Sequence, residues 1–139
     1  MSTSLFSARG LRVALLLIPT ATAAATSNAA TPSELLGAYQ AQSGGATPLA
    51  SRGQQFFNAS HGREWTCAAC HGAVPTQTGK HAATGKAIAP LAPAFNPERF
   101  TDATKTEKWF RRNCNDVVGR ECTAAEKADL LAWLLTLKP

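Results

Sequence analysis

The sequence contains one methionine, and that residue is Met1. No other methionine thioether is therefore available to bind a metal. The leader also lacks a long hydrophobic segment, because its apolar run at 13–18 is far shorter than the roughly 20 residues of a membrane-spanning helix. Alternation of apolar and polar residues never persists as it does in a β-strand. These absences exclude a membrane anchor in the leader and favour an all-α protein with one domain.

Positive charge is too sparse and too dispersed for a nucleic-acid-binding protein. The formal net charge is +5, and it falls to about +3 when the leader residues Arg9 and Arg12 are removed. The basic residues are scattered, with Arg111 and Arg112 as their densest cluster. We therefore exclude nucleic acid as a partner. An acidic redox partner is compatible with this charge, but the charge alone does not indicate one.

The N-terminal segment has the order of features found in a secretory signal peptide. Two arginines precede the short apolar run, and small residues follow it as far as Ala30. We predict a signal peptide over 1–25, cleaved near Ala25 or Ala30, and a mature domain over 26–139. No cysteine lies near these positions, so a lipid anchor is not expected. The mature protein is predicted to be soluble and periplasmic.

The segment EWTCAACHGAVP at 64–75 carries the main chemical signal. Two cysteines separated by two residues can add to the two vinyl groups of a haem, and a histidine directly after them can bind the iron. Cys67, Cys70 and His71 have this spacing. A thioredoxin-like dithiol would need a parallel sheet, and a zinc site would need two more ligands at close spacing. We predict one covalently bound haem c, with His71 as the proximal ligand.

The other two cysteines, Cys114 and Cys122, are predicted to form a disulfide. Export takes the chain into an oxidising compartment, where unpaired thiols do not persist. With Cys67 and Cys70 used for haem attachment, only one pairing of the remaining cysteines is possible.

Three segments have clear helical periodicity, and a fourth near the mature N-terminus is predicted to add a turn or two. The three are 49–59, 104–118 and 123–139, and the fourth is 32–42. Thr104 with Glu107 and Thr123 with Glu126 fit capping boxes at the second and third helices. Gly119 is predicted to end the second helix.

About thirty residues, 72–100, separate the haem motif from the second helix. Loops of this length without secondary structure are uncommon in compact domains and are usually functional. Pro75, Pro90, Pro93 and Pro97 stiffen the loop and discourage strand pairing. A large flat ligand such as haem gives this segment something to enclose.

The ligand on the other face of the iron is less obvious, since no methionine is available. His61, His81, a lysine and an asparagine are candidates, and an open position is a further alternative. His61 precedes the haem motif by only six residues, which places it on the same side. His81 lies in the long loop and could reach over.

The second helix favours Asn113 as this ligand. At about 100° per residue, Asn113 falls inside the arc of the apolar residues, whereas Asn115 falls on the polar side. A buried amide without a partner costs roughly 1–3 kcal/mol, so Asn113 requires one. The arc is formed by Trp109, Phe110, Cys114 and Val117.

The segments at 79–102 and 109–134 resemble the sphaeroides haem protein family, small exported class I cytochromes c. The resemblance extends from about Ser51 to the C-terminus. It implies haem thioethers at Cys67 and Cys70, and His71 as proximal ligand. It also implies Asn113 as sixth ligand, beside a Cys114–Cys122 disulfide.

The same resemblance implies a class I cytochrome c fold, with a few helices around one covalent haem and a long proline-rich loop. The first and last helices are expected to cross near Gly53, with Phe57 and Trp133 in contact. Phe95, Trp65 and Trp109 are expected in the pocket wall. The implied electron donor is a diheme cytochrome c, with a membrane b-type cytochrome upstream.

Three functional hypotheses follow from these observations. The first is electron transfer coupled to binding of oxygen or nitric oxide at the ferrous haem, after release of Asn113. The second is a plain electron carrier with His81 as a permanent sixth ligand. The third is an enzyme that removes nitric oxide or reduces oxygen or peroxide, although no acid–base residue is clearly placed for it.

Overall fold

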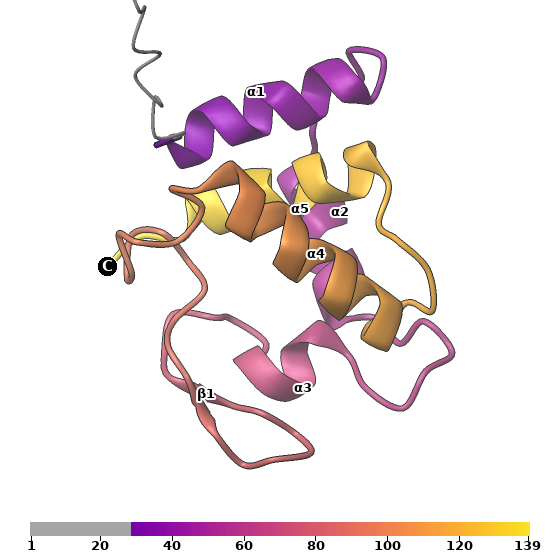
Figure 1. Ribbon diagram of the computed structural model, residues 1–139, viewed down its shortest axis with the longest axis vertical. Coiled ribbons are helices and arrows are strands. Elements are labelled where there is room, and N and C mark those ends of the chain that lie inside the picture. The colour runs from indigo at the N-terminus through magenta and orange to yellow at the C-terminus, as the bar shows by residue number, and fades with distance from the viewer. Residues whose placement is uncertain (1–28) are drawn as a thin grey trace, which may run out of the picture.

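The computed structural model describes residues 29–139, and the predicted signal peptide at 1–25 lies outside them. Helices α1, α4 and α5 occupy one part of the molecule, and α3 and a small hairpin lie toward the opposite end (Figure 1). None of the described helices is long and apolar enough to cross a membrane. The helices are α1 (Pro32–Gln42), α2 (Ala50–Asn58), α3 (Cys67–His71), α4 (Ala103–Val117) and α5 (Ala124–Thr136).

Helix α5 is central, because both α1 and α2 pack against it. Its Leu131 and Leu134 are fully buried. The rings of Phe57 on α2 and Trp133 on α5 lie 5.1 Å apart between centroids, which confirms the expected contact. On the other side of the core, Tyr39 of α1 meets Phe110 of α4 edge to face. The all-α fold is therefore confirmed.

Gly53 lies where α2 crosses α5. A Cβ atom at this position would overlap the backbone carbonyl of Asp129 and would lie 2.8 Å from the backbone nitrogen of Leu130. The glycine therefore permits an approach that any side chain would prevent. This confirms the crossing expected near Gly53.

Substitution of Gly53 by alanine is expected to destabilise the protein by at least about 2 kcal/mol. The gain in helix propensity is roughly 1 kcal/mol. The methyl group would meet backbone atoms of α5, which cannot rotate away, so the cost of overpacking is expected at or above the upper end of its usual range of about 1–3 kcal/mol. Urea unfolding of the haem-containing protein would measure the change. Gly37→Ala is the matched control, since its added Cβ has nothing within 4 Å. Equal stability of the two variants would show that the crossing tolerates a side chain.

Asp129 caps α2 from a distance. It is buried on α5, and its carboxylate accepts hydrogen bonds from the backbone N–H of Leu49 at 2.6 Å and from Arg52 Nε at 2.6 Å. Leu49 is the N-cap residue of α2 and provides no side-chain cap of its own. Asp129 therefore supplies the acceptor that the local sequence lacks. No pattern in the sequence indicated this role.

The start of α4 differs from the prediction. The helix begins one residue earlier than predicted, and its N-cap is Asp102, whose side chain accepts from the backbone N–H of Lys105 at 2.8 Å. The proposed capping box of Thr104 and Glu107 is therefore wrong. Aspartate is as good an N-cap as threonine, and Glu107 instead accepts a hydrogen bond from Lys127 at 2.7 Å.

Two other predicted helix features are confirmed, although α5 ends at Thr136 rather than at 139. Thr123 and Glu126 form the capping box at the start of α5. Gly119 has a positive φ of 80° just beyond the end of α4, a conformation that glycine adopts without strain. Helix α1 is longer than the predicted turn or two, because Thr31 and Glu34 form a further capping box that the sequence analysis missed.

The long loop contains one element that was not predicted. Gly79–Lys80 (β1) pairs antiparallel with Ala87–Ile88 (β2), so the expectation of no strands is wrong for this short hairpin. Each strand has only two residues, too short for alternation to be visible in the sequence. The rest of the loop is held by Arg99, which donates hydrogen bonds to the backbone carbonyls of Pro90 at 2.9 Å and Ala89 at 2.7 Å.

Candidate functional site

The candidate haem site is built on the short helix α3. Thr66 caps this helix by accepting a hydrogen bond from the backbone N–H of Ala69, and Gly72 follows its end with a positive φ of 79°. Cys67 and Cys70 lie three residues apart and therefore share one helical face. Both thiols are free and half-buried. His71 is the last residue of the helix, so one helical turn presents all three side chains.

The environment of His71 keeps its imidazole neutral. Its ring lies 6.1 Å from that of Phe57 on α2. Burial lowers the pKa of His71 to about 4, and the positive charge of Arg99 acts in the same direction. A neutral imidazole has a free lone pair, which is the form that binds a metal. Burial also raises the pKa of Cys67, to about 11.

The long loop returns to α3 through its hairpin. A Cβ atom on Gly79 would overlap the backbone carbonyl of Cys70, so glycine is required for this approach. The backbone N–H of Ala82 donates a hydrogen bond to the sulfur of Cys70 at 3.3 Å. The hairpin of the loop therefore packs directly against the haem-attachment motif, and the prediction that the loop encloses a large flat ligand stays a prediction.

Asn113 lies on α4 at the edge of the buried stripe and is exposed. The helical arc was centred incorrectly in the sequence analysis: the residues buried toward the core are Thr106, Phe110, Cys114 and Val117. Because Phe110 packs on Tyr39 of α1, the stripe faces the helical core, and Asn113 flanks it. The Asn113 side chain forms no hydrogen bond with any residue in 29–139, whereas Asn115 donates to the Arg111 carbonyl at 2.7 Å.

The three aromatic residues expected in a pocket wall are not part of the main core. Phe95 and Trp65 are half-buried, and Trp109 is 44% exposed. Trp109 lies one helical turn before Asn113, on the same flank of α4.

The two alternative histidine ligands have local partners. The ring of His61 packs against that of Phe56 at a tilt of 44°, with 4.5 Å between ring centroids, and its Nε2 is 2.9 Å from the Phe56 carbonyl oxygen. His81 accepts a hydrogen bond at Nδ1 from the backbone N–H of Thr84 at 3.2 Å. His81 directly precedes Ala82, whose backbone N–H donates to the sulfur of Cys70. His81 therefore lies near the haem-attachment helix α3.

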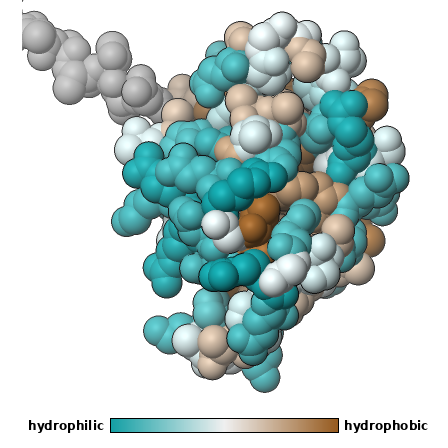
Figure 2. All heavy atoms as spheres, turned by 90° about the vertical axis from the view of Figure 1, so that its right-hand side faces the viewer, coloured by the Kyte–Doolittle hydropathy of each residue, from teal (hydrophilic) through white to brown (hydrophobic). Residues whose placement is uncertain are grey.

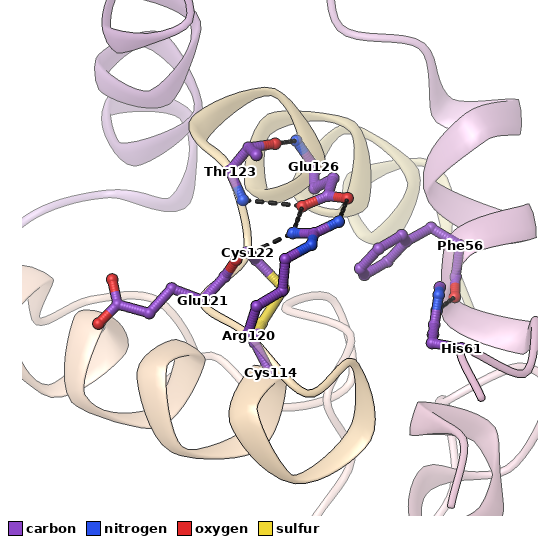
Figure 3. A network of polar contacts seen from close by, with 8 residues as sticks. All are labelled: Phe56, His61, Cys114, Arg120, Glu121, Cys122, Thr123 and Glu126. Atoms are coloured by element: carbon purple, nitrogen blue, oxygen red, sulfur yellow. Dashed lines mark hydrogen bonds and ion pairs between the residues drawn. A yellow bond between two sulfur atoms is a disulfide. The ribbon is translucent and has the colours of Figure 1, made fainter. Parts of the chain in front are cut away.

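The predicted disulfide is present. Cys114 at the end of α4 and Cys122 before α5 are bonded and buried, with 5.6 Å between their Cα atoms. Arg120 lies between the two cysteines in sequence, and its guanidinium pairs with both carboxylate oxygens of Glu126, at 2.8 and 2.6 Å. Figure 3 shows this pair beside the disulfide. The connection between α4 and α5 is therefore held covalently and by a two-point ion pair.

Replacement of Cys114 and Cys122 by serine is expected to lower the free energy of unfolding by about 2–3 kcal/mol. Closing a loop of this length restricts the unfolded chain by that amount. Denaturant titration of the oxidised protein would measure the loss. Haem content should not change, because neither cysteine lies on α3. A stability equal to that of the parent protein would contradict this structural role.

The donor set of α3 fits a covalently bound haem. It combines two unbridged thiols on one helical face with an adjacent neutral imidazole, which is what haem c attachment requires.

A hollow of about 280 Å³ elsewhere, between α2 and α5, includes none of these residues and is lined by Arg52, Gln55, Phe56, Ala59, Glu126 and Asp129. Figure 2 shows one side of the molecule, where mainly hydrophilic side chains surround a small hydrophobic hollow.

Comparisons with known proteins show which family the chain belongs to. Residues 43–134 match a family described as a domain of unknown function, DUF1924. The cytochrome c-type protein SHP of Cereibacter sphaeroides is 50% identical over 107 residues, which are 74% of this chain and 81% of the relative. Cytochrome c'' of Methylophilus methylotrophus is 45% identical over 93 residues, 64% of this chain and 65% of the relative.

Solved structures give the same result for the fold. The structure of oxidised SHP, described as an oxygen-binding cytochrome c, has a TM-score of 0.72 and 48% identity, covering 77% of this chain and 97% of that one. Oxidised cytochrome c'' has a TM-score of 0.67 and 38% identity, covering 78% and 95%. Given this identity and shared helical fold, the chain belongs to the sphaeroides haem protein family and is a mono-haem c-type cytochrome that carries covalently bound haem c.

Proposed function

We propose that Cys67 and Cys70 form the two thioether bonds to the haem and that His71 is the proximal iron ligand. The observation that carries this assignment is the single helical turn that presents all three side chains. The other two cysteines are joined in a disulfide and are not available. When bound, the haem supplies an iron that exchanges one electron and offers two axial positions.

We further propose Asn113 as the distal ligand in the ferric state. Its exposed amide has no hydrogen-bond partner within residues 29–139, whereas His61 and His81 both have local partners. An amide oxygen is a neutral, hard donor, and hard donors prefer the more highly charged metal. Asn113 therefore holds ferric iron better than ferrous iron and leaves on reduction. Its freed amide N–H group would remain nearby as a hydrogen-bond donor.

The function proposed from these ligands is electron transfer coupled to binding of oxygen or nitric oxide at the ferrous haem. Two findings on relatives support it. SHP is described as an oxygen-binding cytochrome c. A solution structure of cytochrome c'', with a TM-score of 0.67 and 37% identity over 78% of this chain and 94% of that one, is described as giving insights into haem-ligand detachment. Diheme cytochrome c remains the proposed electron donor, with a membrane b-type cytochrome upstream, on the family resemblance alone.

The proposed location is the periplasm, after removal of a signal peptide. The backbone N–H of Ala30 donates to the Thr101 carbonyl at 2.8 Å, and Ala29 forms a bridge with Asp102. Both contacts tie this segment to the start of α4. They favour cleavage near Ala25 over cleavage at Ala30, and the intact mass of the exported protein would determine the site.

The test is the visible absorption spectrum of the exported protein in ferric and ferrous forms, before and after addition of carbon monoxide. The proposal expects a low-spin ferric form and a high-spin ferrous form that shifts with carbon monoxide. A low-spin ferrous form that does not respond would mean a permanent sixth ligand. The protein would then be a plain electron carrier, with His81 as the remaining candidate.

A further inference from the structure

The solvent-exposed face of α4 carries a group of basic side chains that are not adjacent in the sequence. Lys105, Lys108 and Arg112 are exposed, and at about 100° per residue they fall within an arc of about 60°. None of the three forms an ion pair with another residue in 29–139. The acidic residue between them in sequence, Glu107, turns instead to Lys127, 2.7 Å away. Asp116, also exposed, lies beside the arc at its C-terminal end and forms no ion pair with these three residues. The helix therefore presents a stripe of net positive charge to solvent.

The adjoining Arg111 strengthens this charge. Its Nε lies 3.3 Å from Glu121, but both side chains are about two-thirds exposed. Pairs of this kind contribute little and are screened by salt. The positive potential of Arg111 therefore remains available to an approaching partner.

Trp109 lies at the edge of the positive stripe. Its ring is 44% exposed, and the guanidinium carbon of Arg112 lies 5.7 Å from the ring centroid. Tryptophan and arginine are the residues most enriched at the energetic centres of protein interfaces. Trp109 also precedes Asn113 by four residues, a rise of about 6 Å along the helix. The stripe and its tryptophan therefore border the proposed distal ligand.

We infer that Lys105, Lys108, Trp109 and Arg112, here called the α4 basic face, form the docking surface for an acidic electron-transfer protein. The inference rests on the proposed function, since it places the partner beside the proposed distal ligand. One electron leaves the reduced partner and is accepted by the haem of this chain. No covalent bond is formed or broken and no proton is required; the only bond that would be lost is the proposed coordination of ferric iron by Asn113.

The positive charge of the α4 basic face would steer an acidic partner toward it. A cluster of like charges on one face raises the encounter rate with an oppositely charged protein by about 10-fold to 1,000-fold at low ionic strength. The effect decays as salt shortens the Debye length, which is about 10 Å at 0.1 M. Basic side chains spread evenly around a helix would not direct the encounter to one site.

The experiment is stopped-flow reduction of the ferric haem protein by an acidic flavodoxin in its hydroquinone form, over a range of ionic strength. The test variant is Lys105→Gln/Lys108→Gln/Arg112→Gln. The matched control, Lys80→Gln/Lys86→Gln/Lys138→Gln, removes the same charge from exposed positions on the hairpin and at the C-terminus. At low salt the test variant is expected to react about tenfold more slowly than the control, and the difference should vanish at high salt.

A small cationic reductant, hexaammineruthenium(II), distinguishes loss of the docking surface from loss of a reducible haem. It should reduce the test variant at least as fast as the parent protein, which shows that the haem is intact. Equal rates with flavodoxin for both variants, or a greater loss in the control, would overturn the docking surface alone. Failure of both reductants to reduce the parent protein would instead overturn the proposed function.

Discussion

Replacement of Cys67 and Cys70 by alanine is expected to abolish covalent attachment of the haem. Both thiols lie on the same face of α3, and each provides one thioether bond. The measurement is the mass of the denatured exported protein, together with its absorbance after extraction with acidified acetone. The parent protein should retain its haem under these conditions and the double variant should lose it completely.

The Cys114→Ser/Cys122→Ser variant is the control for the number of cysteines. It removes two cysteines as well, but from the disulfide. It should keep the haem attached. If the first variant retained covalent haem, or the control lost it, the assignment of the four cysteines would have to be exchanged.

Asn113→Ala should convert the ferric form from low-spin to high-spin and leave the ferrous form unchanged. The amide is proposed as a ligand of ferric iron only, so its removal destabilises that state selectively. The midpoint potential should therefore rise, by about 59 mV for each tenfold of ferric preference that is lost. Redox titration followed by visible absorption would measure both effects in one experiment.

Asn115→Ala provides the matched control on the same helix. Its amide is exposed and donates to the Arg111 carbonyl, so neither spectrum nor potential should change. If Asn113→Ala gave the parent spectrum and potential, another residue would have to be the distal ligand. A change in Asn115→Ala alone would reverse the choice between the two asparagines.

Local patterns were sufficient to predict most of the fold. The capping box of Thr123 and Glu126 and the positive φ of Gly119 depend on neighbours in sequence, and both are present. The contacts of Gly53 followed from the family resemblance and from the cost of a glycine inside a helix. Thr104 was misread because Asp102, two residues earlier, is an equally good cap.

Features that depend on tertiary contacts were not predictable in the same way. Asp129 caps α2 across 80 residues of sequence, which no local pattern indicates. The helical arc of α4 could be drawn from the sequence, but its orientation depends on where Tyr39 meets Phe110. For that reason Asn113 was placed in the middle of the buried face, although it lies at the edge. The α4 basic face was missed because its cations are adjacent only on the helix.

The Cys114–Cys122 bond also bears on how the proposed release of Asn113 would occur. Asn113 directly precedes a buried, covalently tethered residue, so the backbone at its side is fixed. The proposed release of its amide would then require only loss of its bond to the iron and rotation about side-chain bonds, the latter a motion of picoseconds to nanoseconds in exposed residues, and no displacement of a helix. The change in coordination is then confined to the iron and one side chain, and the backbone of α4 stays in place. The haem protein would thus combine an exchangeable coordination site with a rigid backbone frame.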